Sequence, residues 1–172
     1  MDEILKQRSL YLEKVYSQIK FRRKEHQTKL VRNGFRKSMR EDSLFLILKD
    51  FYSGVIRESF CEKFPFRVDF YVPEKDLFIE YQGFWTHGKH PFDISSEKDL
   101  TILKKWRNLD QRIYKNGVDV CVWSVKDPVK RKIAEENNIK LVEIFSLNLK
   151  PEKIKNFLEN FNQSGNRYSF LL

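Results

Sequence analysis

The sequence predicts an α/β fold in which helices flank a mixed β-sheet, with a basic helical extension at the N-terminus. Two short segments of alternating apolar and polar residues, joined by a turn sequence, indicate an antiparallel hairpin in the middle of the chain. Strand-like and helix-like segments then alternate through the second half, which is typical of parallel crossovers. With 41% hydrophobic residues in 172, the chain can bury the core of one domain.

Each expected element has a local signal. Ser38 and Glu41 form a capping-box pattern before an apolar stripe, which predicts a helix. Proline in the first turn favours helices that begin near Pro128 and Pro151. In chain order, we expect a helix at 2–29, a joint at Asn33-Gly34, a helix at 41–53, strands at 66–73 and 77–83, a helix at 97–115, a strand at 118–123, a helix at 128–138, a strand at 140–145 and a helix at 151–161. The parts are a basic extension over 1–37, a core over 38–161 and a tail over 162–172 that is expected to dock on the core.

The hairpin is expected to bring two carboxylates to one face. Alternation places Asp69 away from the more apolar face of its strand. If the turn closes over 73–76, Val72 pairs with Leu77, and Asp69 lies opposite Glu80. A three- or five-residue loop would make the two acids diagonal, but they would still face the same way. Opposed like charges destabilise a sheet unless a cation offsets them. An amphipathic hairpin with a solvated acidic face is the alternative.

The acids favour a hard cation over zinc. Oxygen ligands from Asp69 and Glu80, joined by the Tyr81 carbonyl and water, suit Mg²⁺, with Mn²⁺ as a substitute. Such an ion would polarise a phosphate and lower the pKa of bound water. A zinc knuckle is not expected, because Cys61 and Cys121 lie far apart and form no Cys-x2-Cys pair. The sequence also contains no Walker loop, nucleophile elbow or Rossmann glycine pattern.

Several separated motifs resemble one group of nucleases. Asp69, followed by Glu80-Tyr81-Gln82 on the next strand, resembles the PD-(D/E)xK nuclease signature. The continuation Gly83-Phe84-Trp85-Thr86-His87 is similar to the very-short-patch repair endonucleases and the EDxHD-type phage and intron homing endonucleases. Residues 130–145 resemble the helix and final strand of phage members, so the resemblance spans about 38–145. It implies a restriction-endonuclease-like core that hydrolyses DNA.

The resemblance also implies which groups handle the attacking water. Gln82 stands where the superfamily usually has lysine. An amide can hydrogen-bond water but cannot act as a base near neutral pH. His87 is the nearest group that can take a proton there. The alternative for His87 is a structural role, in which it caps a turn or stacks on Trp85.

Two more acids match the family pattern. Glu41 is the best match for the upstream glutamate, although it could instead close the capping box, and Asp42 could serve in its place. Asp93 resembles the last aspartate of the pattern in its order along the chain. The resemblance therefore implies a catalytic set of Glu41, Asp69, Glu80, Gln82, His87 and Asp93.

The excess positive charge is concentrated in one segment. The chain has a formal net charge of +9. Residues 20–40 hold nine Lys or Arg against Glu25 alone, which gives +8 and leaves +1 for all other residues. Such a segment is expected to contact the phosphates of double-stranded DNA through Lys20, Arg22, Arg23, Lys24, Lys29, Arg32, Arg36, Lys37 and Arg40. RNA, an anionic membrane or plain solvation would also suit it.

Taken together, these features predict a Mg²⁺-dependent DNA endonuclease, favouring a phage or intron-associated homing enzyme. A mismatch-nicking repair endonuclease would share the chemistry, and a decayed DNA-binding module is the non-enzymatic alternative. One active site per chain requires a homodimer or two successive nicks for a double-strand break. The charged start, the short apolar runs and the two isolated cysteines predict no membrane span and a reducing cytoplasm, that of the host if the chain is phage-encoded.

Overall fold

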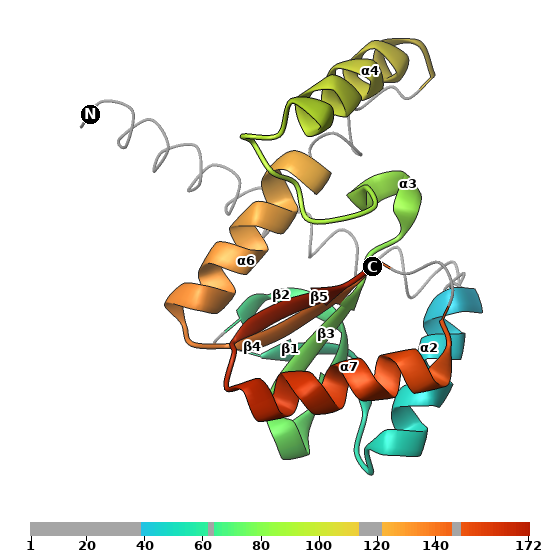
Figure 1. Ribbon diagram of the computed structural model, residues 1–172, viewed down its shortest axis with the longest axis vertical. Helices are drawn as coiled ribbons and strands as arrows, with labels where there is room; N and C mark the ends of the chain where they lie inside the picture. Colours follow the sequence, from blue (N-terminus) through green and yellow to red (C-terminus); the bar gives the residue numbers. More distant parts are fainter. Residues whose placement is uncertain (1–38, 62–63, 114–121, 146–148) are drawn as a thin grey trace. The chain divides into compact units, whose positions relative to one another are not determined.

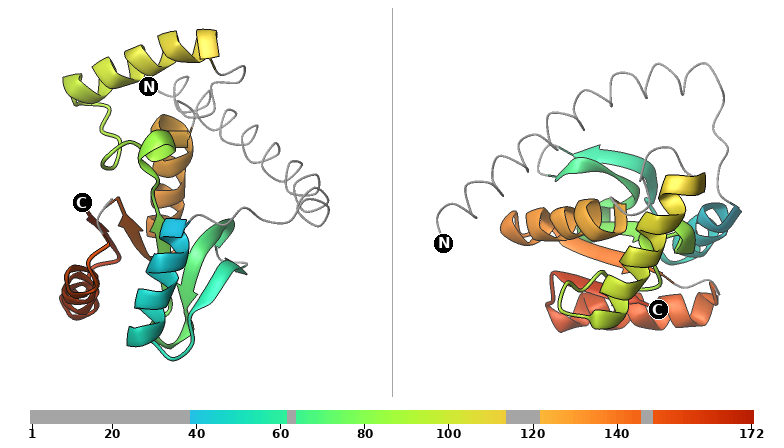
Figure 2. Two further views of the ribbon diagram at one scale, coloured as in Figure 1. Left: turned by 90° about the vertical axis from the view of Figure 1, so that its right-hand side faces the viewer. Right: turned by 90° about the horizontal axis from the view of Figure 1, so that it is seen from above.

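The computed structural model describes residues 39–61, 64–113, 122–145 and 149–172 (Figure 1). The chain divides after Ser38, and residues 39–172 form one unit. That unit is α/β, with a five-stranded mixed sheet flanked by helices (Figures 1 and 2). The expected helix at 2–29 and the joint at Asn33-Gly34 lie outside the described residues. No helix among the described residues is long and apolar enough to cross a membrane.

The sheet has the strand order β1-β2-β3-β4-β5. Its strands are β1 Ile56–Cys61, β2 Phe64–Val72, β3 Leu77–Tyr81, β4 Lys140–Ile144 and β5 Tyr168–Leu171. The strands β1, β2 and β3 pair antiparallel, whereas β3, β4 and β5 pair parallel. The helices are α2 Met39–Phe51, α3 Phe84–His87, α4 Glu97–Ile113, α6 Asp127–Glu136 and α7 Pro151–Ser164, and a π-helical turn, Val122–Lys126, runs into α6. The expected mixed sheet is therefore confirmed.

The register of the hairpin is the one expected for a four-residue turn. A 3₁₀ turn, Pro73–Lys75, joins β2 to β3 and ends at Asp76 in a left-handed conformation, where the Asp76 N–H donates to the Pro73 carbonyl at 3.1 Å. Val72 pairs with Leu77, followed by Tyr71 with Phe78. Since each residue alternates in direction, Asp69 and Glu80 point away from the face that carries Val72 and Leu77.

Helices cover both faces of the sheet. The main core lies on the face of β3 that carries Leu77 and Ile79, where α2 and α7 pack against it. On this side the buried residues include Leu44 and Leu48 from α2, Ile154, Leu158 and Phe161 from α7, and Val142 and Ile144 from β4. Helix α6 lies on the opposite face of the sheet (Figure 2). There its Lys130 and Arg131 side chains contact acids of β3 and β4. The candidate site lies on this second face.

Two sequence expectations differ from the structure. The strand expected at 118–123 is wrong at Val122 and Trp123, which lie in the π-helical turn, while 118–121 lie outside the described residues. A short apolar run of this kind fits a buried helical segment as well as a strand. The tail also does more than dock, because α7 continues to Ser164 and β5 then adds a parallel strand beside β4.

Candidate active site

Asp69 and Glu80 lie on neighbouring strands, next to the paired residues Phe70 and Ile79. Asp69 Oδ2 accepts a hydrogen bond from the Tyr81 backbone N–H at 2.7 Å, so its carboxylate reaches across to β3. Glu80 is 5% exposed and lies beneath α6. Because Phe70 pairs with Ile79, the register places Asp69 opposite Glu80, as the sequence predicts.

Burial makes both acids hard to ionise. It raises the pKa of Glu80 to about 8, with a smaller increase from the charge of Asp69 and a partial offset from the nearby Lys130 ammonium. Burial also raises the pKa of Asp69, against the hydrogen bond from Tyr81 and the attraction of Lys130. An added positive charge would therefore stabilise the ionised pair.

A lysine reaches Glu80 from another part of the chain. Lys130, on α6, donates from Nζ to Glu80 Oε1 at 2.8 Å. Burial alone would lower the pKa of Lys130, but the charge of Glu80 and its hydrogen bond outweigh burial, so the pKa lies above its usual value. Nuclease motifs of this kind usually have a lysine at the position of Gln82. In this chain the lysine ammonium beside Glu80 comes instead from Lys130 on α6.

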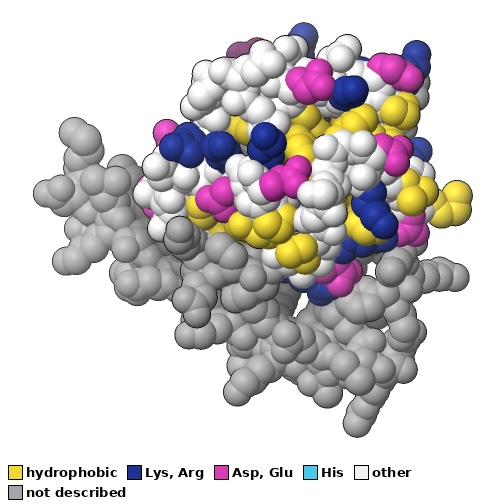
Figure 3. Space-filling model, turned by 90° about the horizontal axis from the view of Figure 1, so that it is seen from below, with side chains coloured by type: hydrophobic (Ala, Val, Ile, Leu, Met, Phe, Trp, Pro, Cys, Tyr) yellow, Lys and Arg dark blue, Asp and Glu magenta, His cyan; other side chains and the backbone are white. Residues whose placement is uncertain are grey.

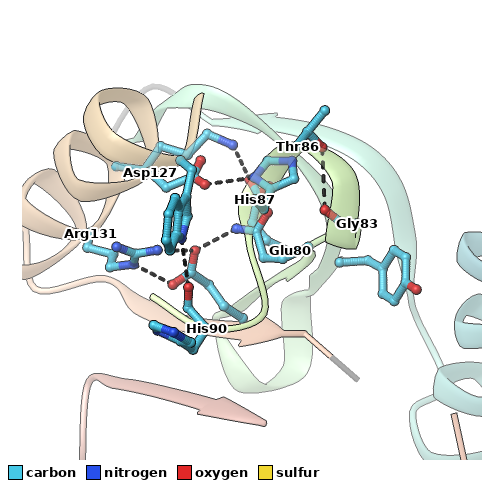
Figure 4. Close-up of polar contacts among 12 residues, drawn as sticks. Glu80, Gly83, Thr86, His87, His90, Asp127 and Arg131 are labelled. Carbon is cyan, nitrogen blue, oxygen red and sulfur yellow. Dashed lines mark hydrogen bonds and ion pairs between the residues drawn. The ribbon is translucent and has the colours of Figure 1, made fainter. Parts of the chain in front are cut away.

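His87 lies beside a buried aspartate. His87 Nδ1 is 2.7 Å from Asp127 Oδ2, and the two side chains face each other in Figure 4. Asp127 is 1% exposed and begins α6. When Asp127 accepts a hydrogen bond from Nδ1–H, the neutral ring presents Nε2 as its acceptor. This arrangement suits a proton acceptor, and its carboxylate partner was not among the residues expected from the sequence.

A tight packing contact fixes the turn that follows His87. Gly88 has φ +68°, and a Cβ added there would lie 2.5 Å from the Trp123 ring. Trp123 is 1% exposed, and its Nε1–H donates to the His90 carbonyl at 2.8 Å. Because Trp123 lies one π-helical turn before Asp127, the same segment holds the loop of His87 and supplies its partner.

Glu41 lies in the first turn of α2, close enough to Asp69 for their charges to interact. Burial raises the pKa of Glu41, and repulsion by Asp69 raises it further. Asp42, the alternative to Glu41, accepts a hydrogen bond from Arg57 Nη1 at 2.6 Å, so its carboxylate is engaged in an ion pair with β1. The structure therefore brings Glu41 to the edge of the cluster.

Gln82 is held in a separate buried network. Its side chain is fully buried, and Nε2 donates to Glu143 Oε1 at 2.5 Å. Glu143 also accepts from Arg131 Nε at 2.5 Å and from the Tyr168 hydroxyl at 2.6 Å. The amide thus ties β3 to β4, α6 and β5. Whether Gln82 also orients water stays a prediction.

Asp93 is not brought to the cluster. It is exposed, and its Oδ1 accepts hydrogen bonds from the backbone N–H and the hydroxyl of Ser95 at 2.8 and 2.7 Å. These bonds lower its pKa and show that it caps a turn. Of the nine basic residues expected to contact DNA, Arg40 is described and lies exposed at the start of α2, while the other eight lie outside the described residues.

The donor set fits a hard cation chemically. Asp69 and Glu80 supply carboxylate oxygens, and Asp127 Oδ1 is buried with no hydrogen-bond partner among the described residues. In the same part of the chain, no three His, Cys, Asp or Glu side chains are already gathered into a metal-binding group. The Mg²⁺ site therefore stays a prediction.

Asp127 and Lys130 are the residues of the candidate site that sequence reasoning missed. Both lie on α6, 40 and 50 residues after their partners His87 and Glu80. The one local signal was the Asp127-Pro128 pair. It predicts the start of a helix but not which side chains of that helix contact the sheet. No protein-family model and no curated protein matches this chain.

Proposed function

We propose that this chain is a metal-dependent DNA endonuclease with a restriction-endonuclease-like core. The observation that carries the proposal is the convergence of Asp69 and Glu80, from adjacent strands, with the His87–Asp127 pair. Buried acids beside a histidine held by a carboxylate suit cation-assisted hydrolysis. The motifs from Asp69 to His87 resemble those of very-short-patch-repair-like and EDxHD homing endonucleases.

Each residue has a role in this proposal. Asp69, Glu80 and the Tyr81 carbonyl would hold Mg²⁺ or Mn²⁺, which when bound supplies charge to polarise the phosphate and to acidify water. His87 accepts the proton at Nε2 while Asp127 keeps Nδ1 protonated and the ring oriented. Glu41, near Asp69, adds negative charge that favours cation binding.

The proposed substrate is double-stranded DNA. Basic and acidic side chains are interspersed on the face of the described unit seen in Figure 3. The segment 20–40, with its charge of +8, is the candidate for sequence-independent phosphate contacts. We favour a phage or intron-associated homing enzyme in a host cytoplasm, acting as a dimer or through successive nicks.

Incubation of supercoiled plasmid with the protein and Mg²⁺ tests this function. We expect nicked or linear DNA, and no product with EDTA. Asp69→Asn and Glu80→Gln should abolish cleavage and leave DNA affinity nearly intact, because phosphate contacts dominate binding. Asparagine at 69 can still accept the Tyr81 hydrogen bond, which keeps the fold. Glu136→Gln, at an exposed acid of α6, is the matched control and should cleave normally.

A mismatch-nicking repair endonuclease is the second candidate, favoured by the likeness of Gly83–His87 to very-short-patch enzymes. Paired duplexes with and without a single mismatch separate the two functions. Strand-specific nicking of the mismatched duplex alone supports repair, whereas cleavage of a fully paired site supports homing. DNA binding without cleavage of either duplex would identify a decayed module and refute the enzymatic proposal.

A further inference from the structure

A buried lysine ammonium lies among the carboxylates. Lys130 Nζ is 2.8 Å from Glu80 Oε1, and the two side chains are 18% and 6% exposed. The same ammonium interacts electrostatically with Asp69 and Asp127, and it lies 5.9 Å from the centre of the Phe66 ring. The charges of three acids therefore act on one cation that the protein itself supplies, and Glu80 is the acid in contact with it.

The neighbouring ion pair on the sheet is of a different kind. Glu80 and Glu143 are register partners on the parallel strands β3 and β4, and α6 sends Lys130 to the first and Arg131 to the second. Glu143 accepts hydrogen bonds from Gln82, Arg131 and Tyr168. Among the described residues, Glu80 accepts a side-chain hydrogen bond from Lys130 alone. The carboxylate oxygens of Glu143 are thus already hydrogen-bonded, whereas the Glu80 carboxylate can still bind another cation.

Lys130 also differs from the next lysine of its helix. Lys132 is 53% exposed and pairs with Glu136 at 3.5 Å, four residues along α6. That is an ordinary surface pair, which adds little stability. By contrast, removing the partner of a buried acid leaves its charge uncompensated and is costly.

We propose that Lys130 is the resident counter-ion of the site, holding Glu80 in the metal-free protein and giving up Glu80 Oε1 when a divalent cation binds. This inference rests on the cation site of the proposed function. An ammonium and a divalent cation that share one carboxylate repel each other strongly at contact distance. The flexible four-carbon stem of lysine lets the charge withdraw without any change in the backbone.

Side-chain NMR of the wild-type protein with ¹³C-labelled lysine tests the displacement directly. The ε-methylene signal of Lys130 is assigned by its loss in Lys130→Arg. We expect this signal to move with added Mg²⁺ and to saturate together with cation binding, while that of Lys132 stays in place. A Lys130 signal that does not move when Mg²⁺ is bound overturns the inference.

The affinity of Mg²⁺ for a variant without the ammonium provides the second test. Calorimetry at pH 9.5 compares the wild type with Lys130→Met and with the matched control Lys132→Met, because loss of the ammonium raises the pKa of Glu80 above its wild-type value of about 8. Removing a competing charge should tighten Mg²⁺ binding by roughly tenfold or more in Lys130→Met, and the control should bind like the wild type. Lys130→Gln, which keeps a donor but no charge, replaces the methionine variant if that variant does not fold.

The outcomes separate this inference from the proposed function. Equal or weaker binding in Lys130→Met and Lys130→Gln, beside clear binding in the wild type, refutes the resident counter-ion and leaves the nuclease proposal standing. If neither the wild type nor the variants bind Mg²⁺, the cation site itself is wrong, and both proposals fail.

Discussion

Asp127 Oδ2 lies 2.7 Å from His87 Nδ1, although 40 residues separate the two in the chain. The pair joins the short helix α3 to the first residue of α6. A histidine oriented in this way has one defined acceptor nitrogen, which a catalytic base needs.

Replacing His87 with alanine should lower the rate of DNA cleavage by roughly 10²–10⁴-fold, the usual contribution of a general acid or base. Asp127→Asn should have a smaller effect, because an amide oxygen still accepts from Nδ1–H but stabilises a charged ring less. Single-turnover nicking measures both. Because the two residues act as one unit, the double variant should be no slower than His87→Ala. Multiplied effects in the double variant would show that Asp127 acts without His87.

Cation binding should depend on pH through Glu80. Burial raises the pKa of Glu80 to about 8, so below that pH a bound proton competes with the cation. The affinity for Mg²⁺ should therefore rise by about tenfold per pH unit as the pH increases towards 8, and then level off. Calorimetry between pH 6 and 9 measures this change. An affinity that is constant from pH 6 to 8 would contradict the role of Glu80 as a ligand.

A comparison of two glycines separates the effect of the Gly88–Trp123 contact from the effect of backbone strain. Gly88 and Gly165 both have positive φ, at +68° and +72°, but only Gly88 has atoms, those of Trp123, where a Cβ would lie. Gly165→Ala should cost about 1 kcal/mol of unfolding free energy from strain. Gly88→Ala should cost more and also slow cleavage, because the loop that carries His87 must shift. Urea unfolding and nicking assays measure the two effects, and equal stability losses would argue against the contact.

Gln82 should be more important for stability than its place in the motif implies. Gln82→Leu removes a donor from the buried Glu143 and should cost about 1–3 kcal/mol in urea unfolding. Gln163→Leu, at an exposed amide of α7, is the control and should change stability little. Gln82→Lys can still donate to Glu143, so it should keep activity. A Gln82→Leu variant with unchanged stability but no cleavage would instead place the amide in the water-handling role.

The basic segment should determine the salt dependence of DNA binding. Neutralising Arg22, Arg23 and Lys24 together should weaken affinity for all sequences and reduce the log–log salt slope by about one unit per lost phosphate contact. Fluorescence anisotropy at several salt concentrations measures the slope. An unchanged slope would mean that these side chains face solvent and that DNA binds elsewhere.

The hairpin could be predicted because its information is local. The alternation around Asp69 and Glu80 and a four-residue turn together define the register, and the observed Val72–Leu77 pair confirms it. The helices at α2, α6 and α7 were likewise found from their caps, prolines and apolar stripes, within a few residues of the observed ends.

The partners of the site acids could not be predicted, because they depend on which face α6 presents to the sheet. Nothing in the local sequence separates Lys130, which is buried on Glu80, from Lys132, which is exposed. Order along the chain pointed to Asp93 as the last aspartate, yet Asp127 lies beside His87 and Asp93 caps a surface turn. Strand β1 was also missed, since its residues show little apolar alternation before pairing with β2.

The π-helical turn should make the proposed active site sensitive to insertions and deletions. Trp123 is fixed against Gly88, and Asp127 follows it at the end of that turn. Removing one residue between them, such as Val125, would turn everything after it by about 100° around the helix axis. Asp127 would then point away from His87, and Lys130 would point away from Glu80. No residue of the proposed site would be missing from the sequence. Reading-frame-preserving single-codon deletions in this segment should thus be selected against as strongly as substitution of the acids themselves.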